Sequence, residues 1–482
     1  MSVSDVAVCQ PEMGTGEMNS ATSDTKTFGD FDKFGLEPFA SQLTRYLLVD
    51  AAREDGSYVL SLNSEFGSGK TTFFEMWANK LRSGEDPLEV VYLNAWESDF
   101  QGDPLLAVVT NLLDQLRQDD TRAKAESIKE TAGKLGKFAL SIGNDVVERF
   151  TGVNVIEAGQ YAERGKEDAK AKLGHICFEL YHQRQALFEE LKSSLRDLTQ
   201  ELERPTIVLV DELDRCRPSY AIEFLETIKH FFDIKGLVFV LGVDKKQLAS
   251  SAKCLFGQEL DFDEYYRKFA HRNVMLPVKS PPVTARFCRA LAQDYFSQKA
   301  FAERKRFSYI KHDQYCEDNI VELCNAFSLN ARQIHELFRI ASHVFSATQK
   351  PDSHLTWGFH VATLFMATLC VKNHTMYHRI GRREMSIEEF TTFLNESRLC
   401  ATGDGFWWAA LLYVGAFGDE NVDKLKDAFI QLGVWDASKD EEEAFQEELR
   451  RFLPAYSSWH GPRHFFFDIY TVLEDLKAFA ED

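Results

Sequence analysis

The stretch SLNSEFGSGKTTFF, residues 61–74, decides the fold that we expect for this chain. It overlaps the end of the apolar run SYVLSLN, residues 57–63, which has the composition of a β-strand, and it leads into a segment with helical spacing. Between them lies GSGKTT, residues 67–72. Glycines let backbone N–H groups surround an anion, and the start of the next helix adds its dipole and unpaired N–H groups. The stretch therefore predicts a phosphate-binding loop.

One position departs from the Walker A pattern G-x-x-x-x-G-K-[ST]. The pattern places its first glycine at residue 64, where this chain has serine. The first glycine eases the bend out of the strand, whereas Gly69, Lys70 and Thr71 make the phosphate contacts. Serine enters such a turn at modest cost if its φ stays negative. We therefore interpret the loop as a working site, with Lys70 on the β- and γ-phosphates and the Thr71 hydroxyl on Mg²⁺.

A second motif follows downstream in TIVLVDELDRC, residues 206–216. Its apolar run closed by acids fits a strand buried on both faces of a parallel sheet. Asp211 is expected to hold Mg²⁺, and Glu212 to orient and polarise the attacking water as a general base. The alternative is that Asp211, Glu212 and Asp214 only solubilise the strand end. Against it, crowded like charges are costly unless a cation resolves them.

Further polar side chains are candidates for the same site. Arg215 and Arg332 can supply positive charge to the transition state, although a surface salt bridge explains each of them equally well. Asn94, at the tip of the second predicted strand, is expected to hydrogen-bond Glu212 and gate its position. His335 falls within a helical pattern, and we interpret it as structural.

The order of elements predicts the fold class and the domains. Strands alternate with helices up to about residue 280, which indicates a parallel α/β sheet. The strands are expected at 57–63, 88–97, 206–216, 236–248 and 273–278. The predicted domains are a disordered lead at 1–27, a sheet domain in two parts at 28–119 and 204–280, a helical insertion at 120–203, and an all-helical domain at 281–482.

The composition argues against several classes of protein. A net charge of −20 gives no strong sign of direct nucleic-acid binding. The nine cysteines form no CxxC pair and no zinc-ligand spacing, which favours reduced thiols. No signal-peptide layout is present, and no apolar run approaches the roughly 18 residues that a bilayer requires. We expect a soluble, cytoplasmic protein.

Four segments together resemble one family, the KAP P-loop NTPases. They are SEFGSGKTTF, VVYLNAWESDFQGDPLLAVV, the run from TIVLVDELDRC to LGVDKKQL, and SLNARQIHELFRI. The third is the most specific, because it resembles the family's D-[DE]-L-D-R run followed by a helix and a strand that ends in V-D. The resemblance covers roughly residues 30 to 380, without the insertion.

The resemblance implies a P-loop fold of the additional-strand type, with sheet order 5-1-4-3-2. It implies the phosphate, Mg²⁺ and base roles given above, places Asp244 where related ATPases have a sensor residue, and places Arg332 where they have a second one. Many family members carry membrane helices between the two nucleotide motifs, whereas the insertion here is polar and charged. Bacterial members often act in defence against phage, beside a separate effector.

The leading hypothesis is an ATP hydrolase that uses Mg²⁺ and drives or times a conformational change in an assembly. A protein partner or effector, and a homo- or hetero-oligomer, are expected. The alternatives are a nucleotide-sensing scaffold with little turnover and, less favoured, a small-molecule kinase, for which the chain has no clear lid signal. The residues expected to contact the nucleotide are Phe66, Gly67, Ser68, Gly69, Lys70, Thr71, Thr72, Asn94 and Asp244.

Overall fold

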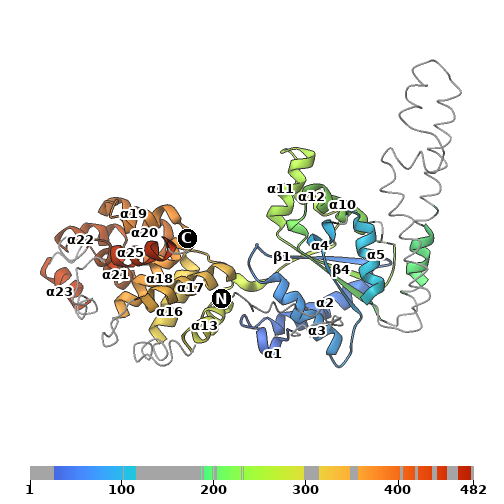
Figure 1. The fold of residues 1–482 in the computed structure, drawn as a ribbon, viewed down its shortest axis with the longest axis horizontal. Coiled ribbons are helices and arrows are strands. Elements are labelled where there is room, and N and C mark those ends of the chain that lie inside the picture. The colour runs from blue at the N-terminus through green and yellow to red at the C-terminus, as the bar shows by residue number, and fades with distance from the viewer. Residues whose placement is uncertain are drawn as a thin grey trace, which may run out of the picture.

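The computed structural model separates into a sheet domain and a helical domain, which lie on the two sides of Figure 1. It describes residues 26–100, 102–115, 186, 189–197, 199, 204–229, 231, 233–297, 314–347, 357–401, 405–417, 422–436, 442–452 and 465–478. Almost all of the predicted lead and most of the predicted insertion lie outside these residues. The described part of the insertion is helical, and its Leu191 and Leu195 are buried in the core of the sheet domain.

A five-stranded parallel sheet forms the centre of the sheet domain. Its strands run β2-β3-β4-β1-β5, and each neighbouring pair is parallel. They are β1 (Tyr58–Asn63), β2 (Val90–Asn94), β3 (Thr206–Asp211), β4 (Leu237–Val243) and β5 (Arg272–Met275). Read from the other edge the order is 5-1-4-3-2, which confirms the predicted additional-strand fold. β2 ends earlier than predicted because Asn94 caps the helix that follows it. β3 and β5 also end earlier than predicted, because a short 3-10 helix follows each of them.

Helices cover both faces of this sheet. On one face lie α2 (Glu37–Arg53) and α3 (Lys70–Ser83), and on the other α5 (Pro104–Gln115), α10 (Pro218–Lys229) and α11 (Lys245–Phe256) (Figure 1). Alternate strand residues enter the two cores: Leu60 belongs to the core that α3 helps to form, and Val59 to the core that α10 helps to form. Because both faces are covered, the central strands β3 and β4 are buried along their whole length and are mainly apolar, whereas the edge strand β5 is mostly exposed. The short elements are α1 (Phe28–Phe31), α4 (Ala95–Asp99), η2 (Leu213–Arg215), α12 (Phe262–Tyr266) and η3 (Pro277–Lys279).

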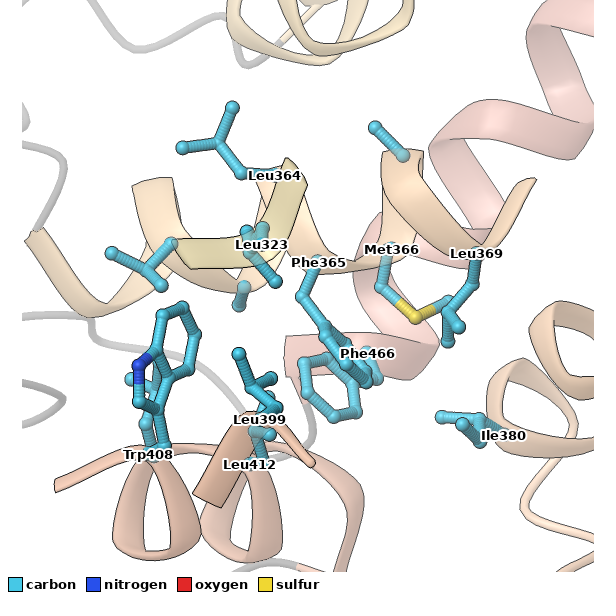
Figure 2. Close-up of a cluster of buried hydrophobic side chains, with 14 of the residues drawn as sticks. Leu323, Leu364, Phe365, Met366, Leu369, Ile380, Leu399, Trp408, Leu412 and Phe466 are labelled. Carbon is cyan, nitrogen blue, oxygen red and sulfur yellow. The ribbon is translucent and has the colours of Figure 1, made fainter. Parts of the chain in front are cut away.

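The second domain is helical throughout its described residues, as predicted. Its elements are α13 (Pro281–Ser297), α16 (Gln314–Ala326), α17 (Ala331–Ala347), α18 (Trp357–Lys372), α19 (His374–Gly381), α20 (Ile387–Ser397), η5 (Leu399–Ala401), α21 (Gly405–Phe417), α22 (Val422–Gln431), α23 (Glu442–Phe452) and α25 (Phe465–Ala478). Figure 2 shows its core, where Phe365 of α18 stacks on Phe466 of α25. None of the helices that the structure describes has both the length and the apolar content needed to cross a bilayer.

The helical domain contains a buried histidine whose protonation the fold disfavours. His360 on α18 is 3% exposed, packs edge-on against Phe345, and has no hydrogen-bond partner for Nε2 among the described residues. Burial lowers the pKa of His360 to about 4. Between pH values of about 6.5 and 4, His360 is therefore protonated in the unfolded chain and neutral in the folded protein.

We expect the His360→Leu variant to lose less stability on acidification than the wild type. As the pH falls from about 6.5 to 4, the unfolded chain binds a proton that the folded chain excludes, so this histidine costs at most about 3 kcal/mol of unfolding free energy. Urea unfolding at several pH values measures the effect. His343→Leu, which removes an exposed histidine on α17, is the control. Identical pH profiles for wild type and His360→Leu would contradict the prediction.

Candidate functional site

A cleft of about 520 Å³ lies at the carboxyl ends of β1 and β3, between the two domains. Four parts of the chain line it: the segment 26–36, the loop and first turn of α3, the residues that follow β3, and the helical domain. The lining residues of the last two parts are Asp211, Glu212, Asp214, Arg215, Phe287, Ala331, Arg332 and His335. The cleft thus brings together both sequence motifs and Arg332, the predicted arginine of the helical domain.

The loop between β1 and α3 has the backbone of an anion site. Gly67 and Gly69 have φ values of 75° and 94°, a region that favours glycine over residues with a Cβ. α3 begins at Lys70, so its unpaired N–H groups and the positive end of its dipole border the cleft. Phe66, Ser68, Thr71 and Thr72 also line it. These features fit a polyphosphate.

Ser64 replaces the usual glycine without distorting the loop. It is 3% exposed and is not among the non-glycine residues with positive φ. Its N–H donates to the Val243 carbonyl at 3.0 Å, and its hydroxyl donates to Ser68 Oγ at 2.6 Å. Its carbonyl accepts a hydrogen bond from Lys70 Nζ at 2.7 Å. The serine therefore makes the turn in an ordinary conformation and adds a hydrogen bond inside the loop.

The buried amine of Lys70 has an acidic partner. Lys70 Nζ lies 3.6 Å from Asp214 Oδ2, and the two side chains are 8% and 4% exposed. Burial raises the pKa of Asp214, and the neighbouring Lys70 charge counteracts part of that shift. From the sequence Asp214 is only one of three crowded acids. The structure separates it from the other two, because it faces the lysine from the turn after β3.

Asp211 is fully buried at the end of β3, with both carboxylate oxygens engaged. Oδ1 accepts a hydrogen bond from Glu212 N, and Oδ2 accepts one from Tyr92 Oη, both at 2.9 Å. Burial, followed by the Asp211 charge, raises the pKa of Tyr92, so the phenol remains a donor. No motif in the sequence marks Tyr92 as part of the site. Only the register of β2 against β3, which pairs Asn94 with Asp211, brings this side chain to the carboxylate.

Glu212 is held in a conformation that favours glycine. Its φ is 60°, which is costly for a residue with a Cβ and places its side chain at the edge of the cleft. Burial is the largest influence on the pKa of Glu212 and raises it, whereas Arg215 and a hydrogen bond from Asn94 lower it. The Arg215 guanidinium lies 2.8 Å from Glu212 Oε1. Asn94 thus lies beside Glu212 and caps α4 through its Oδ1, but it is not one of the residues that line the cleft, and its gating role stays a prediction.

The two predicted arginines meet at the ring of Phe66. Arg215 Cζ lies 4.9 Å from the ring centroid, and Arg332 Cζ lies 4.6 Å from it. The N–H of Arg332 also donates to the Gly67 carbonyl at 3.0 Å. The first turn of α17 therefore rests on the phosphate-binding loop, and the helical domain contributes directly to the site.

Asp244 lies behind the loop. It caps α11 by accepting a hydrogen bond from Lys246 N, and its Oδ2 accepts another from Phe66 N at 3.0 Å. It is 5% exposed and is not one of the residues that line the cleft. This placement braces the loop from the β4 side, and a sensor role for Asp244 stays a prediction.

The segment 26–36 forms a wall of the cleft that the sequence analysis did not assign to the site. Phe34 stacks on Phe287 of α13 with ring centroids 3.9 Å apart, and Lys33 pairs with Asp294 of the same helix. His335 lines the cleft as well, and burial lowers its pKa. No motif in the sequence marks this wall, because it is created by contacts with the helical domain.

The donor atoms at the loop suit Mg²⁺ in combination with phosphate. Thr71 and Asp211 both border the cleft, and they offer a hydroxyl and a carboxylate. Among the described residues no group of three His, Cys, Asp or Glu side chains is placed to hold a metal ion. Mg²⁺ usually takes one or two carboxylates and completes its octahedron with phosphate oxygens and water. The residues present fit that arrangement.

The model for the KAP family P-loop domain matches residues 36–369, which is more than half of the chain. No curated protein matches the chain. Among solved structures, the ORC2 protein of Aeropyrum pernix in ADPNP–ADP complexes is 12% identical, with a TM-score of 0.33, over 92% of this chain and 95% of that one. Drosophila ORC bound to GC-rich DNA and Cdc6 is 12% identical, with a TM-score of 0.29, over 98% and 78%. Likenesses this remote carry no conclusion about what the chain binds.

Proposed function

This chain belongs to the KAP family of P-loop domains, and we propose that it hydrolyses ATP with the help of Mg²⁺. One observation carries the proposal: Lys70, Asp211 and Glu212, from two segments far apart in the sequence, line the same cleft. An amine for phosphate, a carboxylate for a cation and a carboxylate for water are the groups that phosphoryl transfer to water requires.

Each residue has a separate task in this proposal. The backbone N–H groups of the loop and Lys70 bind the β- and γ-phosphates, and Thr71 and Asp211 hold Mg²⁺. When bound, Mg²⁺ neutralises negative charge that develops on the phosphates. Tyr92 keeps Asp211 oriented through its hydrogen bond. Glu212 orients a water molecule toward the γ-phosphate and accepts its proton, while Arg332 stabilises the charge on the γ-phosphoryl group.

A second candidate, a nucleotide-sensing scaffold with little turnover, is favoured by one contact. Arg215 is paired with Glu212 at 2.8 Å, so the general base is occupied by a cation in this arrangement. A base held in this way is poorly placed to take a proton until Arg215 moves. In either case the contact of α17 with the loop links the nucleotide to the helical domain. A partner protein, an oligomer and a role in defence against phage stay predictions of the family resemblance, and a cytoplasmic location stays a prediction from the composition.

Turnover measured against protein concentration tests the proposal and separates the two candidates. We expect phosphate release from ATP in the presence of Mg²⁺ and none in EDTA. A rate per chain that rises with concentration is expected if a neighbouring chain or partner displaces Arg215. Tight ATP binding without turnover at any concentration would favour the scaffold, and a failure to bind ATP would contradict both.

A further inference from the structure

Phe66 occupies an unusual place in the loop. Phe66 is 41% exposed, so burial of apolar surface accounts for its position only in part. Instead its two guanidinium neighbours, those of Arg215 and Arg332, lie 4.9 Å and 4.6 Å from the ring centroid. The faces of an aromatic ring carry partial negative charge and attract cations. The ring therefore allows two like charges to share one side of the cleft.

The backbone of Phe66 is fixed from both domains. Its N–H donates to Asp244 Oδ2 at 3.0 Å, and its carbonyl accepts a hydrogen bond from Asn330 Nδ2 at 3.2 Å. Asp244 follows β4 of the sheet domain, whereas Asn330 precedes α17 of the helical domain. These two bonds fix the backbone from which the ring projects. The ring thus stands at a defined point of contact between the domains.

The two arginines connect the ring to different parts of the site. Arg215 pairs with Glu212 at 2.8 Å and lies 5.9 Å from the ring centroid of Trp96 on α4. Arg332 belongs to the helical domain, and its N–H is bonded to the carbonyl of Gly67. Phe66 is therefore the link between the arginine on the general base and the arginine supplied by the other domain.

We propose that Phe66 is a positioning residue that holds Arg332 ready for the γ-phosphate and Arg215 beside Glu212. This role rests on the proposed nucleotide site and adds to it a way in which the helical domain discriminates between ATP and ADP. A guanidinium held over a ring has lost most of its freedom before nucleotide binds, so its transfer to a phosphate costs less entropy than recruitment of a free side chain. Since only ATP carries a γ-phosphate, this arrangement adds affinity for ATP and none for ADP.

The test separates the aromatic face of Phe66 from its bulk. The Phe66→Leu variant keeps an apolar side chain without a π face, and Phe66→Tyr keeps the face. We expect Phe66→Leu to lower the ratio of affinities for a non-hydrolysable ATP analogue over ADP by about tenfold, and Phe66→Tyr to leave it unchanged. Calorimetric titration of each protein with both nucleotides gives the ratio. Phe256→Leu, the same change on an exposed ring of α11, is the control.

A double variant shows whether the effect passes through Arg332. Arg332→Gln should lower the ratio at least as much as Phe66→Leu, and adding Phe66→Leu to it should change nothing further. Additive effects would overturn the proposal, as would a wild-type ratio in Phe66→Leu or a lowered ratio in Phe66→Tyr. Because the readout is binding, it remains decisive if the wild type fails to hydrolyse ATP. Failure of the proposed nucleotide site would instead appear as no binding of either nucleotide, and failure of hydrolysis alone would appear as binding without turnover.

Discussion

Replacing Lys70 with methionine is expected to weaken ATP binding by about 100-fold, because the loop loses the positive charge that binds the phosphates. Methionine retains the unbranched shape of the lysine stem, so the backbone of the loop keeps its form. The same change also affects the folded state, since Lys70 Nζ neutralises Asp214 inside the protein. Two effects of one substitution must therefore be measured apart.

The loss of stability in Lys70→Met should depend on pH. Breaking a buried ion pair by removing one partner costs about 3 kcal/mol or more, unless the remaining charge takes up a proton. Burial already raises the pKa of Asp214, and Lys70 is the largest influence that lowers it, so without Lys70 this pKa rises further. When a carboxyl group has a higher pKa in the folded protein than in the unfolded chain, the protein loses stability as the pH rises above the pKa of the unfolded chain. We expect the variant to be more destabilised relative to wild type at pH 8 than at pH 5.

A double variant distinguishes the two effects. Lys70→Met combined with Asp214→Asn removes both charges. The double variant should therefore regain most of the wild-type stability and the wild-type dependence of stability on pH, whereas ATP binding should remain weak. Urea unfolding and nucleotide titration on the same samples give both quantities. If ATP binds to Lys70→Met with wild-type affinity, the loop is not the phosphate site. If the double variant is no more stable than Lys70→Met, an unpaired Asp214 charge is not what destabilises the single variant.

Replacing Glu212 with glutamine is expected to lower ATP turnover by at least about 100-fold while ATP binding persists. Glutamine has the same shape and the same cost at a φ of 60°, and its amide can still hydrogen-bond Asn94, but it cannot accept a proton from water. The phosphate contacts of Lys70 and the loop are unchanged. Single-turnover kinetics and nucleotide titration measure chemistry and binding separately.

Glu97→Gln is the matched control for this variant. Glu97 is exposed on α4, accepts a hydrogen bond from the same Asn94 at 3.0 Å, and is not one of the residues that line the cleft. Glu97→Gln changes the same hydrogen-bond network and removes the same amount of charge as Glu212→Gln. Because Glu97 does not line the cleft, turnover should stay near the wild-type rate. Wild-type turnover in Glu212→Gln would show that another group activates the water, and equal losses in the two variants would point to Asn94 instead.

Much of the sheet domain could be predicted from local patterns. The apolar runs of β1, β3 and β4, the glycines of the loop and the acids after Val210 can each be recognised in a short window of sequence, because they reflect burial on two faces or local backbone geometry. The parallel sheet follows from those patterns, and the family resemblance supplied its strand order. The substitution at Ser64 could also be judged tolerable, since a negative φ is enough for the turn.

The partners inside the site came only from the tertiary structure. Tyr92 and Asp211 are 119 positions apart, and their hydrogen bond depends on the register of two strands. The pairing of Lys70 with Asp214 and the contact of two arginines with the ring of Phe66 likewise join segments that local propensity cannot relate. The sequence by itself determined which chemical groups the protein has and which elements carry them. The tertiary structure decided which groups touch, because side-chain contacts between distant segments depend on how strands align and how the helical domain packs against the loop.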